Sequence, residues 1–127
     1  VRDGYPARLS DGVMEGADLV LAAADDLRTG IPVPMIAARF HNGVAELIVG
    51  SCLRARELSG LGTVALSGGV FQNQLLLERV VAGLDARGLR VLVHSQVPPN
   101  DGGLCLGQLA IAAAVSGRKN RTQMNAD

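Results

Sequence analysis

Two glycine-containing segments carry the residues whose types and spacing could do chemistry. The first is Ser67-Gly68-Gly69-Val70-Phe71-Gln72-Asn73, and the second is Pro98-Pro99-Asn100-Asp101-Gly102-Gly103. Paired glycines let the backbone turn sharply and bring its N–H groups together with no Cβ in the way. An apolar run with helical spacing follows each segment, and the free N–H groups of a helix's first turn attract anions. The first segment is therefore a candidate cradle for a phosphate group.

Two side chains of the first segment could add hydrogen bonds to such a ligand. Ser67 and Asn73 can each reach a phosphate or a ribose hydroxyl. Asn73 is equally well placed as the N-cap of the following helix. The segment lacks both the Gly-Lys-Ser/Thr ending of a P-loop and the third glycine of a dinucleotide fingerprint. The residues alone therefore leave the cradle and a plain strand-to-helix turn both open.

The second segment offers a carboxylate. Asp101 could be a hard oxygen ligand for a metal ion, which would need further ligands, or the N-cap of the last helix. Asn100, Gly102 and Gly103 form a supporting loop that lets a ligand approach the backbone closely. Two such glycine turns are a stronger signal than one.

The histidines and cysteines give weaker signals. His41 borders the apolar face of a predicted helix, which favours a satisfied, half-buried histidine over a ligand or an acid–base group. His94 ends a predicted strand, where it could reach a crevice at the strand ends or point to solvent, and no role is assigned to it. Cys52 and Cys105 lie far apart in apolar runs, which predicts buried, reduced thiols.

The elements that must position these residues follow from the spacing of apolar side chains. Helices are predicted over residues 13–27, 34–58, 76–87 and 104–115, and strands over residues 63–66 and 89–94. The arginines of the second helix, among them Arg39, are expected on its solvated face. A strand–helix–strand unit gives parallel neighbouring strands, whose carboxyl ends meet at one edge. Both glycine segments should therefore face one crevice.

The pattern predicts an α/β fold with a βαβ unit and packed helices. Residues 1–116 should form one domain and residues 117–127 a flexible tail, while the first twelve residues show no strong pattern. The last helix is apolar nearly all round and is expected to be buried. Two strands are too few for a self-sufficient sheet. We therefore expect one half of a larger fold or pairing with a second copy, and the opening residues indicate a chain cut from a longer one.

Composition excludes several function classes. The 127 residues include 12 Lys plus Arg and 12 Asp plus Glu, which argues against a nucleic-acid partner. One Tyr, two Phe and no Trp provide no platform for stacking bases. No apolar run approaches the roughly 18 residues of a membrane span. With only two cysteines, the expected compartment is the reducing cytoplasm.

Three segments together resemble a known family. Ala38-Arg39-Phe40-His41-Asn42, Leu66 to Asn73, and Pro99 to Gly103 continuing to Gly107-Gln108 are similar to the C-terminal part of the HypF carbamoyltransferases. The order and separation of the segments match as well. The resemblance implies a TsaD-like domain with the actin and sugar-kinase (ASKHA) ATPase fold, of which this chain would be one lobe.

The resemblance also implies a function. In this family, carbamoyl-adenylate is made from carbamoyl phosphate and ATP in a separate YrdC-like domain. The TsaD-like domain then passes the carbamoyl group to the C-terminal cysteine of HypE, on the route to the cyanide ligands of nickel–iron hydrogenases. HypE and the remaining HypF domains would be partners, and a homodimer of this chain is a further expectation.

The resemblance assigns roles to particular residues. Ser67, Gly68, Gly69 and Asn73 match the family's nucleotide-binding turn, and Asp101 matches a ligand of a divalent metal, zinc or iron. The family also takes two histidine ligands from a His-x-x-x-His segment, which this sequence lacks. We therefore expect this chain alone to be inactive. The alternatives are a TsaD-like or O-carbamoyltransferase lobe and a non-catalytic nucleotide-binding or assembly module.

Overall fold

The computed structural model describes residues 3–10 and 12–124. In chain order the elements are β1 (Arg8–Ser10), β2 (Val13–Glu15), α1 (Ala17–Arg28), α2 (Val33–Ser59), β3 (Thr63–Ala65), the 3-10 helix η1 (Gly69–Gln72), α3 (Gln74–Asp85), β4 (Arg90–Leu92), the 3-10 helix η2 (Asp101–Gly103) and α4 (Leu104–Met124). The predicted α/β character is confirmed. No helix in the described ranges is long and apolar enough to cross a membrane.

The predicted βαβ unit forms the centre of the molecule. β3 and β4 pair in parallel, with Thr63 opposite Arg90 and Ala65 opposite Leu92. The Leu66 N–H continues the pairing by donating to the Leu92 carbonyl at 2.9 Å. α3 makes the crossover between the strands, as expected for parallel neighbours. Each strand therefore leads directly into one of the two glycine segments.

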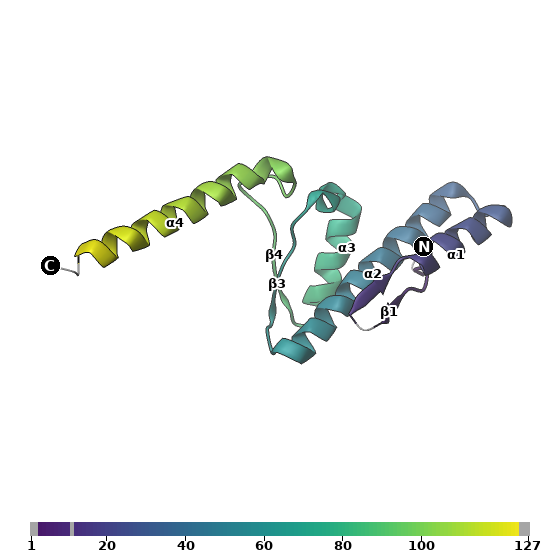
Figure 1. Cartoon of the computed structure of the whole chain (residues 1–127). Coiled ribbons are helices and arrows are strands. Elements are labelled where there is room, and N and C mark those ends of the chain that lie inside the picture. Colours follow the sequence, from purple (N-terminus) through teal and green to yellow (C-terminus); the bar gives the residue numbers. More distant parts are fainter. Residues whose placement is uncertain (1–2, 11, 125–127) are drawn as a thin grey trace.

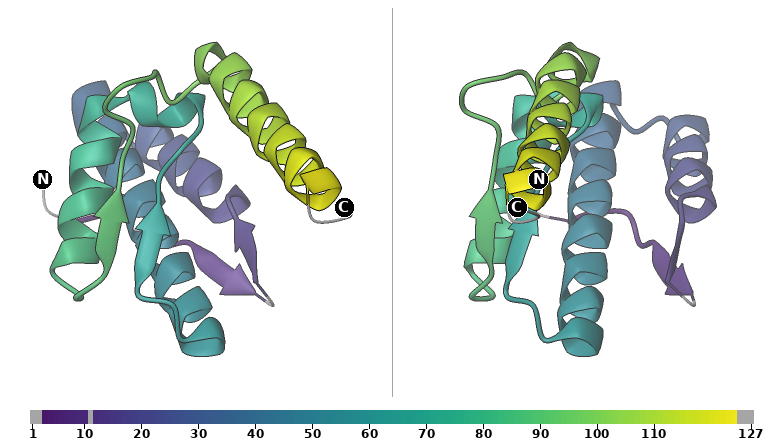
Figure 2. Two further views of the ribbon diagram at one scale, coloured as in Figure 1. Left: turned by 90° about the vertical axis from the view of Figure 1, so that its left-hand side faces the viewer. Right: turned by 60° about the vertical axis from the view of Figure 1, so that its left-hand side comes forward.

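The core lies between the two central helices and one face of this sheet. Val80 and Leu84 of α3 are fully buried, and they belong to a cluster completed by Ala45, Val49, Leu66, Leu76 and Leu89. Figure 2 shows β3 and β4 on one side of α2, with α1 and the β1–β2 hairpin on the other. Gly60 ends α2 in the left-handed conformation, at a φ of 73°. The long helix α2 thus packs against the β3–β4 sheet on one side and against α1 and the β1–β2 hairpin on the other.

The N-terminal part differs from the prediction. The helix expected from Val13 begins at Ala17, because Val13–Glu15 pairs antiparallel with Arg8–Ser10 as a hairpin. Within the turn Gly12 has a φ of 81°, a conformation that glycine adopts readily. The strands are only three residues long, too short for an alternating pattern to stand out from the helical spacing.

The last helix also differs from the prediction. α4 extends to Met124 rather than ending at Val115, and its side chains from Leu104 to Gly117 are exposed. Leu109 and Ile111 keep 66% and 67% of their surface in solvent. Figure 1 shows α4 projecting away from the other elements, so no described element covers it. Cys105 at its start is accordingly exposed rather than buried, while Cys52 is half-buried, and both thiols are free.

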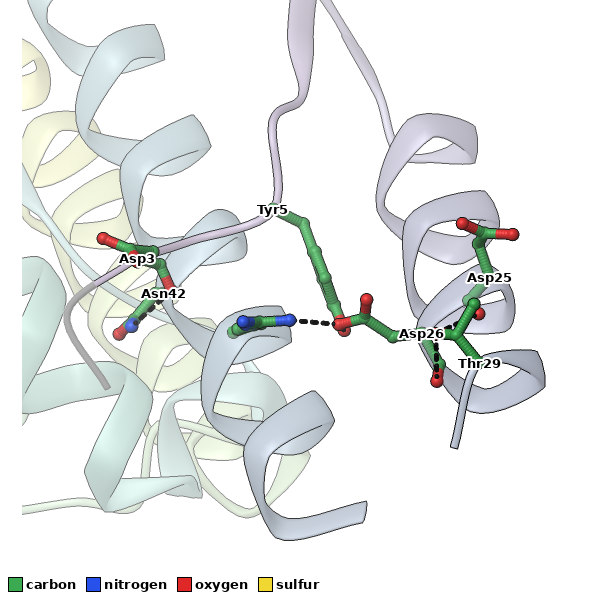
Figure 3. A network of polar contacts seen from close by, with 7 residues as sticks. Asp3, Tyr5, Asp25, Asp26, Thr29 and Asn42 are labelled. Atoms are coloured by element: carbon green, nitrogen blue, oxygen red, sulfur yellow. Dashed lines mark hydrogen bonds and ion pairs between the residues drawn. The ribbon is translucent and has the colours of Figure 1, made fainter. Parts of the chain in front are cut away.

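A polar network joins the N-terminal segment to α1 and α2 (Figure 3). The Tyr5 hydroxyl and the Arg39 guanidinium both donate to Asp26 Oδ2, each at 2.6 Å. The hydrogen bond from Tyr5 and then the one from Arg39 hold the pKa of Asp26 below its usual value. Burial, followed by the contact with Asp26, raises the pKa of Tyr5. Arg39 was expected on a solvated face, but the approach of α1 makes it part of this contact.

Gly43 allows the N-terminal segment to lie directly on α2. A Cβ at Gly43 would stand 2.5 Å from the Tyr5 carbonyl oxygen and 2.6 Å from Leu19 Cδ2. The Tyr5 N–H also donates to the Arg39 carbonyl at 3.2 Å. Since the main chain cannot move aside as a flexible side chain could, a side chain at position 43 would separate the two segments.

We therefore predict opposite effects for two glycine-to-alanine substitutions in α2. Gly43→Ala should destabilise the protein by about 1–3 kcal/mol through overpacking. Gly50→Ala meets nothing within 4 Å and should stabilise it by up to about 1 kcal/mol, because alanine favours the helix. Urea denaturation followed by circular dichroism measures both. Equal effects at the two positions would contradict the close approach.

A second prediction concerns Asp26. Its folded-state pKa is lowered from an unfolded value of about 3.9, so its stabilisation is present at neutral pH and is lost as the pH falls through the lowered folded-state pKa. Asp26→Asn should reduce the melting temperature at pH 7, and its difference from wild type should shrink below about pH 4. Asp25→Asn is the matched control, because Asp25 pairs with Arg28 in solvent, with side-chain exposures of 69% and 82%. A constant difference across pH would contradict the prediction.

Candidate functional site

The two glycine segments lie side by side, as the parallel strands predict. The Gly68 N–H donates to the Pro99 carbonyl at 2.7 Å, which joins the first segment to the second. A groove of about 380 Å³ lies along this junction and is lined by Ser67, Gly68, His94, Pro98, Pro99, Asn100, Asp101, Gly103, Leu104, Gly107, Gln108 and Ile111. The structure thus brings the expected loops to one site.

The first loop turns at Gly68, which has a φ of 106° and a ψ of 156°. This backbone region is open essentially to glycine alone. The Phe71 N–H closes the turn by donating to the Gly68 carbonyl at 3.1 Å. Within the described residues, the N–H groups of Gly69 and Val70 have no hydrogen-bond acceptor. The available donors are therefore those of Gly69 and Val70, while the Gly68 N–H is already engaged.

Asn73 caps α3. Its Oδ1 accepts from the Leu76 N–H at 3.1 Å, and its Nδ2 lies 2.9 Å from His41 Nε2. His41 in turn contacts the Ala37 carbonyl through Nδ1 at 2.8 Å. Asn73 is thus observed as the N-cap of α3, and both ring nitrogens of His41 have hydrogen-bond partners, as considered from the sequence. The nucleotide-binding role of Asn73 stays a prediction.

His94, to which the sequence assigned no role, lies in the site. Its Nε2 lies 2.9 Å from Ser67 Oγ, so the imidazole is attached to the first loop. The register that places Thr63 opposite Arg90 also places Ser67 opposite His94, two residues beyond the end of each strand. No signal in the sequence indicated this contact, because the predicted strands ended at residues 66 and 94 and only the observed pairing fixes the register.

The second loop is held by Asn100 rather than Asp101. Asn100 Oδ1 accepts from the Gly102 N–H at 3.0 Å, and its carbonyl accepts from the Gly103 N–H at the same distance. Asn100 therefore closes the turn through Gly102 and Gly103, while the expected support of a ligand by these three residues stays a prediction. Asn100 is the N-cap of η2, and Asp101, which was considered as the N-cap of the last helix, is instead the first residue of η2, an exposed residue that lines the groove.

The donor set does not fit a complete metal site. Within the described part of the chain, no three His, Cys, Asp or Glu side chains lie close enough together to hold a metal ion. Asp101 makes no hydrogen bond or ion pair with any described residue through its carboxylate. A single carboxylate is an insufficient ligand set for a divalent metal, so this chain offers at most one ligand.

A second pocket of about 320 Å³, with a more polar lining than the groove, adjoins it. It is lined by Leu66, Phe71, Gln72, Gln74, Leu77, Val93, His94 and Pro99. His94 and Pro99 line both spaces and so form the wall between them. The site therefore consists of two neighbouring spaces that share one wall at the end of the parallel strands.

Comparison with known proteins identifies the family. A family model described as the second subdomain of the Kae1-like domain of carbamoyltransferase HypF matches residues 2–108. The chain belongs to the HypF family of carbamoyltransferases. A HypF homologue of Cupriavidus necator is 43% identical over 106 residues, which are 81% of this chain and 27% of that protein. HypF of Synechocystis is 40% identical over 75 residues, which are 59% of this chain and 9% of that protein.

Solved structures agree with the sequence comparison. The crystal structure of full-length HypF in its phosphate- and nucleotide-bound form matches with a TM-score of 0.85 and 33% identity. The match covers 91% of this chain and 16% of the HypF chain. The expected resemblance and the α/β fold of a HypF Kae1-like domain are thereby confirmed. The chain spans about a quarter or less of the length of these HypF proteins.

The two glycines of the first HypF-like loop should respond differently to substitution. Gly68→Ala places a side chain in a strained conformation and should cost about 1–3 kcal/mol of stability. At Gly69 an added Cβ would meet only Asn100 Cβ, at 3.8 Å, so Gly69→Ala should leave stability nearly unchanged. Chemical denaturation compares the two variants. A larger loss at Gly69 would contradict the described turn.

Proposed function

We propose that this chain is the nucleotide-side subdomain of a HypF carbamoyltransferase. The supporting observation is the junction of the two loops, where Ser67, Gly68 and Asp101 line the groove and the free N–H groups of Gly69 and Val70 follow directly after Gly68. Backbone donors at a fixed turn bind phosphate without any charged side chain. The ligand proposed is an adenine nucleotide, ATP or carbamoyl-adenylate, with its phosphate at these donors.

The proposed reaction transfers a carbamoyl group to the C-terminal cysteine of HypE. The thiolate sulfur forms a bond to the carbamoyl carbon, the bond from that carbon to the phosphate oxygen breaks, and AMP leaves with the electron pair. The N–H groups of Gly69 and Val70 would stabilise the charge on the leaving phosphate, since fixed donors act without reorganisation. Ser67 would add a further hydrogen bond, with His94 holding its hydroxyl in place.

Other parts of a HypF protein would supply what this chain lacks. A zinc or iron ion would take Asp101 as one ligand and its remaining ligands from elsewhere, and carbamoyl activation would take place in another domain. The apolar helix α4, which no described element covers, would pack against those parts. An exposed apolar surface of this kind would also promote pairing of two copies of the chain.

A non-catalytic nucleotide-binding or assembly module is the second candidate. The incomplete metal-ligand set favours it. Both candidates share the nucleotide site and differ in whether carbamoyl transfer occurs when the remaining HypF domains are present. A carbamoyl-transfer assay with those domains added therefore separates them.

The nucleotide site is tested directly by titrating this chain with ADP and following its amide resonances by NMR. ADP should shift the amides of Gly69 and Val70. Gly69→Val, which places a bulky side chain beside these donors, should weaken binding by about tenfold, the loss of one hydrogen bond to a charged group.

Gly62→Val is the matched control for this titration. Gly62 immediately precedes the first residue of β3, at the end of the strand opposite to the glycine loop. An added Cβ there meets nothing within 4 Å. Its affinity for ADP should equal that of wild type. If wild type shows no shifts, or if both variants bind equally well, the proposed nucleotide site is wrong.

A further inference from the structure

His41, Asn73 and Leu76 are joined by a series of hydrogen bonds. The chemistry of the contacting atoms determines which atom donates and which accepts in each of them. A carbonyl oxygen can only accept, so the contact with Ala37 at 2.8 Å places the proton of His41 on Nδ1. The neutral imidazole then has its lone pair on Nε2, which accepts from Asn73 Nδ2–H at 2.9 Å. Asn73 Oδ1 is left to accept from the Leu76 N–H at 3.1 Å. The contact with His41 and the contact with Leu76 therefore require the same orientation of the Asn73 amide.

This chain of hydrogen bonds fixes one end of the first glycine loop. Asn73 follows η1 and precedes α3, and its own N–H donates to the Val70 carbonyl at 3.1 Å. Gly68 fixes the other end of the loop through its bond to Pro99 at 2.7 Å. The free N–H groups of Gly69 and Val70 therefore lie between two anchored residues.

The anchor at Asn73 rests on α2, which packs against both α1 and α3. From α3, the Arg79 guanidinium donates to the Ala38 carbonyl at 3.2 Å, one residue beyond the carbonyl that holds His41. α2 and α3 also share the central core. The imidazole is thus held between two helices whose relative position is set by packing.

We propose that His41 is a positioning residue of the nucleotide site. It fixes the Asn73 amide so that Asn73 caps α3 and holds the loop donors in place, without touching the ligand itself. Asn73 then serves the site through the backbone it orients, since its oxygen and one of its N–H bonds are already engaged. The part of this inference that concerns the ligand rests on the proposed nucleotide binding, whereas the anchoring of the loop does not.

The structural part is tested by amide hydrogen exchange on the full chain. His41→Leu removes the acceptor, and His41→Lys offers only donors. Both should speed exchange of the Leu76 amide about fivefold, the effect expected when an N-cap is lost. His41→Gln keeps an acceptor oxygen for Asn73 and should stay near wild type. The Leu84 amide in the buried core serves as the reference for global unfolding.

Two further variants sharpen this test. In an Asn73→Ala background, His41→Leu should have no additional effect on Leu76, because the two residues act through one contact. Glu46→Leu, an exposed change on α2, should leave Leu76 exchange unchanged. Unchanged Leu76 exchange in His41→Leu, or equal changes at Leu76 and Leu84, would overturn the anchoring role.

The ligand part is tested by the affinity of the same variants for ADP. His41→Leu and His41→Lys should bind about fivefold more weakly, with His41→Gln near wild type. Normal ADP affinity in all three would overturn the positioning role. Failure of wild type to bind ADP would overturn both the proposed nucleotide site and the positioning role for it, while the exchange at Leu76 would still decide the anchoring of the loop.

Discussion

The hydrogen bond from the Gly68 N–H to the Pro99 carbonyl is the constraint on which the rest of the site depends. It joins the ends of two parallel strands at the point where both chains leave the sheet. Because that bond uses the Gly68 N–H, the donors left for a ligand are those that follow it. The strained backbone at Gly68 is stabilised by this same contact, so the turn and the junction of the loops form together.

Side chains around the junction mainly hold the backbone in place. Asn100 closes its own loop, Asn73 caps α3 while bound to His41, and His94 holds Ser67. Such a site presents main-chain donors in a fixed geometry and needs no local excess of basic residues, in agreement with the balanced charge of the chain. Preorganised donors of this kind stabilise developing charge without the cost of moving side chains.

Packing is distributed unevenly over the molecule. α2, α3 and the inner face of the two-stranded sheet enclose the core, whereas α4 and the outer sheet face remain in solvent. Two strands cannot make a stable sheet by themselves, and here α2 and α3 supply the covering on one side only. The site lies at the boundary between the packed and the uncovered parts. The proposed ligand site and the proposed surface for other HypF domains are therefore adjacent.

The sequence by itself determined α2, α3, the parallel strands and the meeting of the two glycine segments, because these follow from apolar spacing and from the geometry of a βαβ unit. It also carried the HypF resemblance. Only the tertiary structure decided that the N-terminal residues form a hairpin, that Arg39 pairs with Asp26, that Asn100 caps η2, and that His94 meets Ser67. The exposure of α4 could not be predicted either. Each of these outcomes depends on which residues, distant in sequence, lie within hydrogen-bonding or packing distance, and periodicity along one chain does not contain that information.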